Sequence, residues 1–238
     1  MSGNNDLTEF YTKLLVTNEV FSVVNNTNKI ILEEERKERM QTKELSSENE
    51  YILSFTDNRK NLFLEIIDKM NEFNFHEITS LDKHNFNSFG GDSARYEILD
   101  NEIFLYEHTI NVVIQMADML SESKHPEPII EIGMLLAFFH DFGKSPLVRL
   151  GDKQTIKEGH EHISSNYAKY FLEGYSKRNP KDAISKEVIK LIQDTLYYHH
   201  TPEAKEGIFL KLLRKADRRA RDLELSMVKL RRAENDEI

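Results

Sequence analysis

The segment LLAFFHDFGKSP places a histidine and an aspartate side by side at the end of the most apolar run of the chain. His140 and Asp141 directly follow the apolar residues 134–139. A carboxylate in an apolar interior is costly unless a cation or hydrogen-bond donors compensate it. Because adjacent helical side chains point about 100° apart, these two reach a third group more easily than each other. A divalent metal ion is the simplest such group.

Further polar residues occupy positions that helical periodicity reserves for apolar side chains. His108 begins one row of apolar residues spaced by four, His199 ends another such row, and Asp217 interrupts a third. His160 follows Gly159 at an expected helix start. A lone core histidine is usually only hydrogen-bonded, and Asp217 could instead pair with an arginine three or four residues away. Together, however, these residues lie on five successive expected helices, which can direct them to one centre.

Nearly every periodic segment predicts a helix, because Gly (9) and Pro (5) are scarce and no run alternates as a strand would. The sequence therefore predicts an all-α fold. The core helices are expected over 104–121, 127–139, 160–174, 185–198 and 208–228, with earlier helices over 6–21 and 58–73. Residues 28–50 are highly charged with little apolar face, which indicates an exposed helix or a partly disordered arm.

The stretch 84–102 is rich in Asn, Ser, Gly and Asp and is the best candidate for a domain boundary. Its Gly-Gly pair lacks the Lys-Ser/Thr ending of a phosphate loop, so we assign it no nucleotide-binding role. We expect an N-terminal helical region of unknown role over 1–100, a helical metal-binding domain over 101–228 and a polar C-terminal tail over 229–238.

The composition limits the chemistry. The 238 residues include no cysteine, which excludes disulfides, thiolate ligands and cysteine nucleophiles, so any metal must be held by His, Asp or Glu. The apolar runs are too short for a membrane span of roughly 20 residues, and no secretory signal is evident, so we expect a cytoplasmic protein without a membrane partner. A net charge of −9 disfavours nucleic acid, although Leu212–Glu224 is locally basic. A solvated helix face is the simpler interpretation of that segment.

The order of these segments resembles the HD-domain superfamily of metal-dependent phosphohydrolases. The matching segments are YEHTINVVIQMA, LLAFFHDFGKSP, GHEHISSNYAKYFL, DTLYYHHTPE and LLRKADRRARDLE, which together cover about 104–224. The resemblance implies an HD-domain helical bundle that hydrolyses a phosphomonoester or phosphodiester bond in a nucleotide-type substrate by a metal-activated water. The first hundred residues lie outside the resemblance.

The resemblance also implies a role for each matching residue. The residues that match the ligands of a first metal are His108, His140, Asp141 and Asp217. Those that match the extra histidines of members with a second metal are His160 and His199, with Asp141 bridging both ions. The segments GHEH and HH each contain two histidines, so the choice within each pair stays open.

The remaining matches concern catalysis and the metal. Lys144 matches a residue that commonly contacts substrate phosphate, and His162 or His200 could protonate the leaving oxygen. We expect one or two divalent ions per chain, with Fe or Mn favoured and Mg, Zn, Co and Ni still open. The expected partner is a nucleotide or another phosphoester, and a homodimer is one option for the assembly.

Two branches of the superfamily are disfavoured, and two other functions stay open. The absence of Gly-Tyr-Pro after His-His disfavours cyclic-di-GMP phosphodiesterases, and the lack of an upstream nucleotidyltransferase-like region disfavours tRNA-end-adding and alarmone enzymes. One alternative is a non-catalytic metal-binding interaction module, which the charged arm over 28–50 would suit. The other is a nucleic-acid-processing HD protein of a mobile element, because FLYEHTINVV and KADRRARDLE resemble HD domains of mobile-element relaxases.

Overall fold

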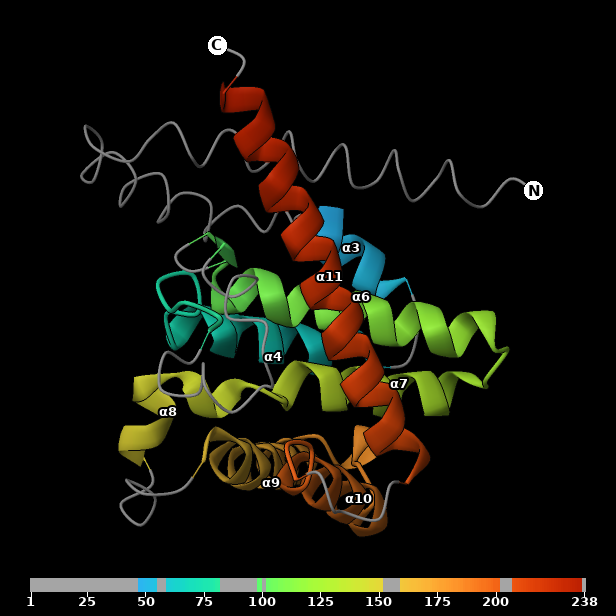
Figure 1. The fold of residues 1–238 in the computed structure, drawn as a ribbon. Helices are drawn as coiled ribbons and strands as arrows, with labels where there is room; N and C mark the ends of the chain where they lie inside the picture. The colour runs from blue at the N-terminus through green and yellow to red at the C-terminus, as the bar shows by residue number, and fades with distance from the viewer. Residues whose placement is uncertain are drawn as a thin grey trace. The chain divides into compact units, whose positions relative to one another are not determined.

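The computed structural model describes residues 47–54, 59–81, 98–99, 102–151, 159–201 and 207–236. Within these ranges the chain is helical, and its extended pairing is limited to an isolated bridge between Thr79 and Phe104. The prediction of an all-α fold is confirmed (Figure 1). The helix expected over 6–21 and most of the arm over 28–50 fall outside the described residues.

The helices expected over 58–73 and from 104 onward begin within two residues of their predicted starts, whereas the helices Ser47–Leu53 and Pro146–Gly151 were not predicted. The described helices are α3 (Ser47–Leu53), α4 (Lys60–Glu72), α6 (Leu105–Glu122), α7 (Glu127–Phe139), α8 (Pro146–Gly151), α9 (His160–Arg178), α10 (Lys186–Tyr197) and α11 (Ile208–Asp236). Short 3-10 turns occupy Phe142–Lys144 and Pro180–Asp182. None of the helices in the described ranges has the length and hydropathy that a membrane span requires.

Two helices continue beyond their predicted ends. α9 passes through Gly174 to Arg178, because a glycine inside a helix costs only about 1 kcal/mol and the packing of α9 on α10 outweighs it. α11 runs to Asp236, so residues 229–236 of the predicted polar tail are helical in the structure. Five of these eight residues are Lys, Arg, Ala or Leu, which are all good helix formers.

The helices pack in pairs around an aromatic core. α6 packs on α7 after a short connection, α11 crosses both helices, and α9 packs on α10 and on the turn Phe142–Lys144 (Figure 1). Phe142 is fully buried, with ring centroids 4.8 Å from Phe75, 5.1 Å from Phe139 and 5.1 Å from Tyr167. This cluster fixes the chain directly after His140 and Asp141, so the core packing also positions the candidate site.

The residues just before α6 belong to the same packed body. Residues Glu48–Ile238 form one compact unit. The ring of Phe63 on α4 stacks on Phe138 of α7 at a centroid distance of 5.6 Å. Arg59, next to α4, forms a 3.0 Å ion pair with the buried Glu131 of α7. α4 and the neighbouring Arg59 therefore contribute directly to the support of α7.

A close approach at Gly143 yields the first prediction. The Gly143 amide donates to the Ser164 hydroxyl at 2.8 Å, and a Cβ atom at Gly143 would collide with the backbone carbonyl of His160. Because backbone cannot move aside as a flexible side chain can, Gly143→Ala should destabilise the fold by about 1–3 kcal/mol. Gly174→Ala is the matched control, since its Cβ would meet only the mobile end of Arg178.

Chemical denaturation of the two variants checks this prediction. In the interior of α9, Gly174→Ala should leave stability unchanged or raise it by up to about 1 kcal/mol, because alanine is the better helix former. Equal unfolding free energies for Gly143→Ala and the parent protein would contradict the close approach of the turn to α9.

Candidate metal centre

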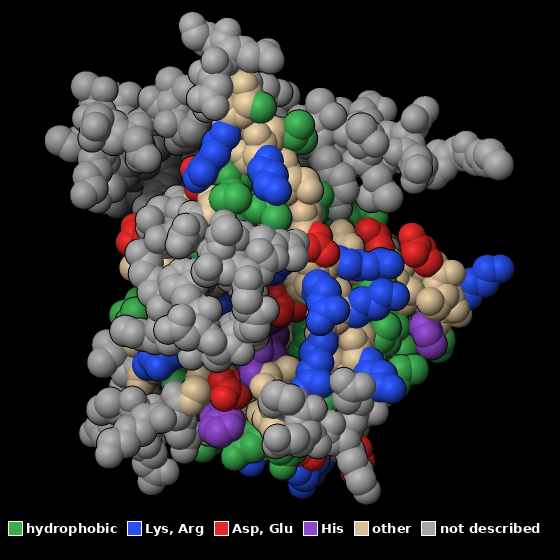
Figure 2. All heavy atoms as spheres, viewed as in Figure 1, with side chains coloured by type: hydrophobic (Ala, Val, Ile, Leu, Met, Phe, Trp, Pro, Cys, Tyr) green, Lys and Arg blue, Asp and Glu red, His purple; other side chains and the backbone are tan. Residues whose placement is uncertain are grey.

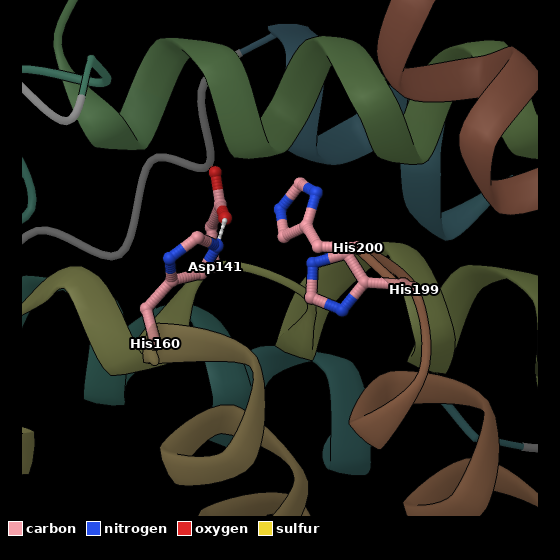
Figure 3. Close-up of side chains that lie close together, drawn as sticks. All are labelled: Asp141, His160, His199 and His200. Atoms are coloured by element: carbon pink, nitrogen blue, oxygen red, sulfur yellow. Dashed lines mark ion pairs between the residues drawn. The ribbon is translucent and has the colours of Figure 1, made fainter. Parts of the chain in front are cut away.

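Two groups of side chains place metal-ligating atoms within 4.8 Å of one another. The first ligand group consists of His108, His140 and Asp217. The second ligand group consists of Asp141, His160, His199 and His200, shown in Figure 3. The structure thus brings together every residue predicted to bind metal, from α6, the end of α7, the start of α9, the end of α10 and α11.

Asp141 lies between the two ligand groups. One carboxylate oxygen, Oδ2, is 3.3 Å from His140 Nε2 and 3.6 Å from His108 Nε2. The other, Oδ1, is 3.3 Å from His160 Nε2. Each oxygen therefore faces a different ligand group. The side chain is almost fully buried, so these contacts lie in a low-dielectric interior. This arrangement suits a carboxylate that is shared by two cations.

Backbone carbonyls fix the orientation of two histidine rings. His140 Nδ1 lies 2.7 Å from the Ala137 carbonyl, and His199 Nδ1 lies 2.6 Å from the Leu196 carbonyl. Since a carbonyl oxygen only accepts, Nδ1 donates in each ring and Nε2 is the nitrogen that faces the other ligands. In both rings Nε2 is therefore the nitrogen available to a metal ion. Carbonyls behind metal-binding histidines commonly impose this orientation.

Buried polar atoms that lack a hydrogen-bond partner test whether these residues fit a metal ion. Within the described part of the chain, Asp141 Oδ1, His160 Nε2 and His199 Nε2 are buried and accept or donate no hydrogen bond. Leaving such atoms unsatisfied costs about 1–3 kcal/mol each. One cation coordinated by all three would remove that cost, so the residues present fit a divalent ion.

The protonation states suit metal binding. Burial, reinforced by His200 and His160, holds the pKa of His199 well below its usual value. Burial together with His160 lowers the pKa of His200 to about 4. Burial opposes ionisation of Asp141, but His140 and Lys144 outweigh it and hold its pKa well below the usual range. At neutral pH His199 and His200 are therefore neutral imidazoles and Asp141 is an ionised carboxylate, the forms that coordinate metals.

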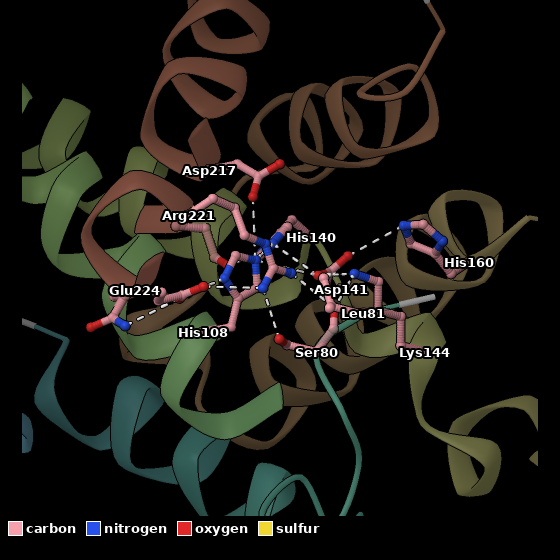
Figure 4. Close-up of polar contacts among 12 residues, drawn as sticks. Ser80, Leu81, His108, His140, Asp141, Lys144, His160, Asp217, Arg221 and Glu224 are labelled. Carbon is pink, nitrogen blue, oxygen red and sulfur yellow. Dashed lines mark hydrogen bonds and ion pairs between the residues drawn. The ribbon is translucent and has the colours of Figure 1, made fainter. Parts of the chain in front are cut away.

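Glu224 orients His108 from behind. This fully buried carboxylate accepts from His108 Nδ1 at 2.9 Å and from Asn111 Nδ2 at 3.1 Å, and it pairs with Arg221 at 3.0 Å (Figure 4). Burial and Arg221 disfavour protonation of His108, but Glu224 and Asp217 outweigh them and raise its pKa. The negative charges of Glu224 and Asp217, which favour the protonated form of His108, would equally favour a cation bound at the first ligand group.

Ser80 connects the two cations that border the site. Its carbonyl accepts from Lys144 Nζ at 2.9 Å and from Arg221 at 2.8 Å, and its hydroxyl accepts from Arg221 at 2.7 Å (Figure 4). Lys144 also donates to Asp141 Oδ2 at 2.6 Å. A continuous chain of charged hydrogen bonds therefore runs from Glu224 through Arg221, Ser80 and Lys144 to Asp141.

Lys144, His162 and His200, the residues predicted to act in catalysis, differ in how they lie relative to the ligand groups. Lys144 lies at the site as expected, and His200 lies inside the second ligand group, with its ring centroid 4.8 Å from that of His160. His162 belongs to neither ligand group, and its ring stacks on Tyr197 at 4.0 Å. Two residues beyond His160 on a helix, His162 projects to the other side of α9.

The arginines near Asp217 have other partners. Arg214 donates to the carbonyls of Tyr198, His199 and Thr201 and so closes the end of α10. Asp217 forms an ion pair with His108 Nε2 at 3.3 Å. The alternative that Asp217 forms simply a salt bridge to Arg214 or Arg221 therefore receives no support from these contacts, in which Arg221 pairs with Glu224.

Sequence reasoning missed Glu224 and Ser80. Glu224 lies seven residues, two helical turns, after Asp217, so a second carboxylate on the same face could have been noticed. Ser80 is 64 residues from Lys144 and 141 from Arg221, and no local pattern marks such contacts.

Comparison with known proteins agrees with this geometry. A family model described as the HD domain matches residues 105–230, which is more than half of the chain. The chain therefore belongs to the HD domain family, whose members are generally metal-dependent phosphohydrolases, and the predicted HD-domain helical bundle is confirmed. Neither the curated proteins nor the solved structures contain a significant match.

The buried Glu224 yields the second prediction. Glu224→Ala would leave His108, Asn111 and Arg221 without their shared acceptor, so the fold should lose about 3–5 kcal/mol. Loss of such an outer partner should also weaken Mn²⁺ binding by about 10–100-fold. Thermal unfolding and Mn²⁺ titration of the folded fraction measure both effects. The exposed Asp222→Ala on the same helix is the control, and equal behaviour of the two variants would contradict the orienting role.

Proposed function

We propose that the chain is a metal-dependent phosphohydrolase that cleaves a phosphomonoester or phosphodiester bond in a nucleotide-type substrate. The observation that supports it most is the pair of ligand groups joined by the carboxylate of Asp141. Membership of the HD domain family supports the same class of reaction. In the reaction, the oxygen of water forms a new bond to phosphorus, the bond to the leaving oxygen breaks, and that oxygen takes up a proton.

Two divalent ions would be held by the two ligand groups, one at each, with Asp141 common to both. When bound, such ions supply an activated water and neutralise charge on the phosphate oxygens. The donor set contains only imidazole nitrogen and carboxylate oxygen, which is consistent with Fe or Mn as the favoured ions.

The residues of the chain have separable parts in this proposal. Together with His140, Lys144 keeps Asp141 ionised. Its side chain is 13% exposed and offers a positive charge to a substrate phosphate at the edge of the site. His200 has a pKa of about 4, so it suits the part of a ligand or proton acceptor and not that of a proton donor at neutral pH. His162 faces away from the ligand groups, and the proposal therefore gives it no catalytic part.

The third prediction concerns the shared carboxylate. Asp141→Ala should abolish tight binding at both ligand groups, because the substitution removes a member of the second group and the carboxylate oxygen that lies 3.3 Å from His140 Nε2 of the first. Elemental analysis of the purified parent protein should find about two Fe or Mn atoms per chain, as expected for a two-metal site. Asp194→Ala, which removes an exposed carboxylate paired with Lys190, is the matched control and should keep the parent metal content.

A folded Asp141→Ala protein that retained the full metal content would rule out this site. A parent protein with about one atom per chain would instead support a mononuclear enzyme that acts on nucleotide monophosphates. The corresponding activity test uses bis(p-nitrophenyl) phosphate as a diester and p-nitrophenyl phosphate as a monoester. Hydrolysis of one of them should disappear with a chelator and return with Mn²⁺, and metal-independent turnover would contradict the proposal.

A further inference from the structure

Two cations meet at Ser80, next to the candidate metal centre. Lys144 Nζ and Arg221 Nη2 both donate to the Ser80 carbonyl, at 2.9 and 2.8 Å, so the two nitrogens lie closer together than the sum of these distances (Figure 4). Ser80 itself is fully buried. Since like charges repel, holding two cations this close requires the negative charges of Asp141 and Glu224, which pair with them.

One edge of the Arg221 guanidinium has no acceptor within the described part of the chain. Its Nη1 donates to the Ser80 hydroxyl at 2.7 Å and to Glu224 at 3.0 Å, and its Nη2 donates to the Ser80 carbonyl. A guanidinium has five N–H groups, so that of Nε and one of Nη2 remain. Because Ser80 accepts from both Nη atoms and covers the edge between them, the two remaining N–H groups share the Nε–Nη2 edge. Two parallel donors on one edge match two oxygens of a phosphate.

Arg221 lies beside the first ligand group. It follows Asp217 by four residues on α11, so both side chains project from the same face of the helix. Burial opposes ionisation of Asp217, but the interactions with His108 and with Arg221, among others, outweigh it and hold its pKa below the usual range. Lys144 Nζ lies 2.6 Å from Asp141 Oδ2, the oxygen that faces the first ligand group. An anion that accepts from both cations is therefore held at the first ligand group.

Both cations have surface and donors to spare. The side chains of Arg221 and Lys144 are 16% and 13% exposed, whereas that of Glu224 is 0% exposed. Lys144 Nζ has three N–H groups and donates to two acceptors among the described residues, so one donor remains. A guanidinium that only compensated Glu224 would need neither an accessible surface nor a second edge. The arrangement therefore fits an anion that arrives from solvent.

We propose that Arg221 is a further substrate-binding residue, whose Nε–Nη2 edge, with the remaining donor of Lys144, binds non-bridging oxygens of the phosphate that is hydrolysed. A planar two-point contact to phosphate is what arginine provides and lysine does not. The buried carbonyl of Ser80 holds both donors in place, so little ordering is needed when a phosphate binds. The inference rests on the proposed function for the identity of the anion.

Calorimetric titration of inorganic phosphate into the Mn²⁺-loaded protein tests the inference. Arg221→Lys retains a positive charge beside Glu224 but removes the two-donor edge. It should weaken phosphate binding by about tenfold or more, the loss expected when a charge-assisted hydrogen bond is removed. Its Mn²⁺ content should equal that of the parent protein. A role confined to orienting Glu224 would instead lower Mn²⁺ binding, and phosphate binding only in step with it.

Arg219→Lys is the matched control. It is the same substitution at an exposed residue of the same helix, and two residues from Arg221 its side chain projects to the opposite side of α11. This variant should bind phosphate as the parent protein does, and circular dichroism checks that both variants are folded. Equal phosphate affinity of Arg221→Lys and the parent, equal losses in both variants, or no phosphate binding by the Mn²⁺-loaded parent would each overturn the inference.

A second measurement needs no substitution. Inorganic phosphate should slow the modification of Arg221 by phenylglyoxal in the Mn²⁺-loaded parent protein, as followed by mass spectrometry of its peptides. Modification of the exposed Arg219 should proceed at the same rate with and without phosphate. Modification of Arg221 that is unaffected by phosphate would count against the inference, whatever the stability of Arg221→Lys.

The outcome is separable from that of the proposed function. Binding of inorganic phosphate requires no turnover, whereas the proposed function is tested by hydrolysis of small nitrophenyl esters. A protein that hydrolyses these esters, but whose Arg221→Lys variant keeps the parent phosphate affinity, contradicts the role of Arg221 alone. A protein that binds phosphate through Arg221 but hydrolyses no ester contradicts the proposed function alone.

Discussion

The burial of one ionised carboxylate, that of Asp141, governs the rest of the structure. An isolated charge in this interior would be prohibitively costly, so the fold surrounds it with compensating groups. His140, His160 and Lys144 lie within 2.6–3.3 Å of its oxygens. To deliver these groups, the fold must bring the ends of α7, α9 and α10 together against α6 and α11. The apolar packing around Phe142 stabilises this arrangement of helices, and the charged contacts of Asp141 determine which side chains meet there.

Much of the site could be predicted because a polar residue on an apolar helical face stands out. His108 and Asp217 were found in this way, and the structure places them 3.3 Å apart. Periodicity helped less with His199 and His200, which follow the last residue of α10, where helical spacing no longer applies. The end of α9 was misplaced because the local preference of a glycine is weaker than the packing of a whole helix. Ser80 was out of reach, since its partners are distant in sequence.

Electrostatics in this chain act on two length scales. Inside the bundle, charges separated by a few ångströms decide protonation states, because little water screens them. On the surface, salt limits the reach of a charge to about 8–10 Å. An anion at the edge of the site therefore responds to Lys144 and Arg221 and not to the net charge of −9. For this reason the total charge describes the chain as a whole and does not decide what one face of it attracts.

The contacts of Ser80 show which residues before the family match are needed to keep the candidate site intact. The family match begins at residue 105, yet Ser80 lies before it and holds both Lys144 and Arg221. A fragment cut at the family boundary would retain all the candidate ligands but would leave two neighbouring cations without the acceptor that they share. Their repulsion would then act on Asp141 and on Glu224. The shortest segment that preserves the site is therefore longer than the segment that the family model matches.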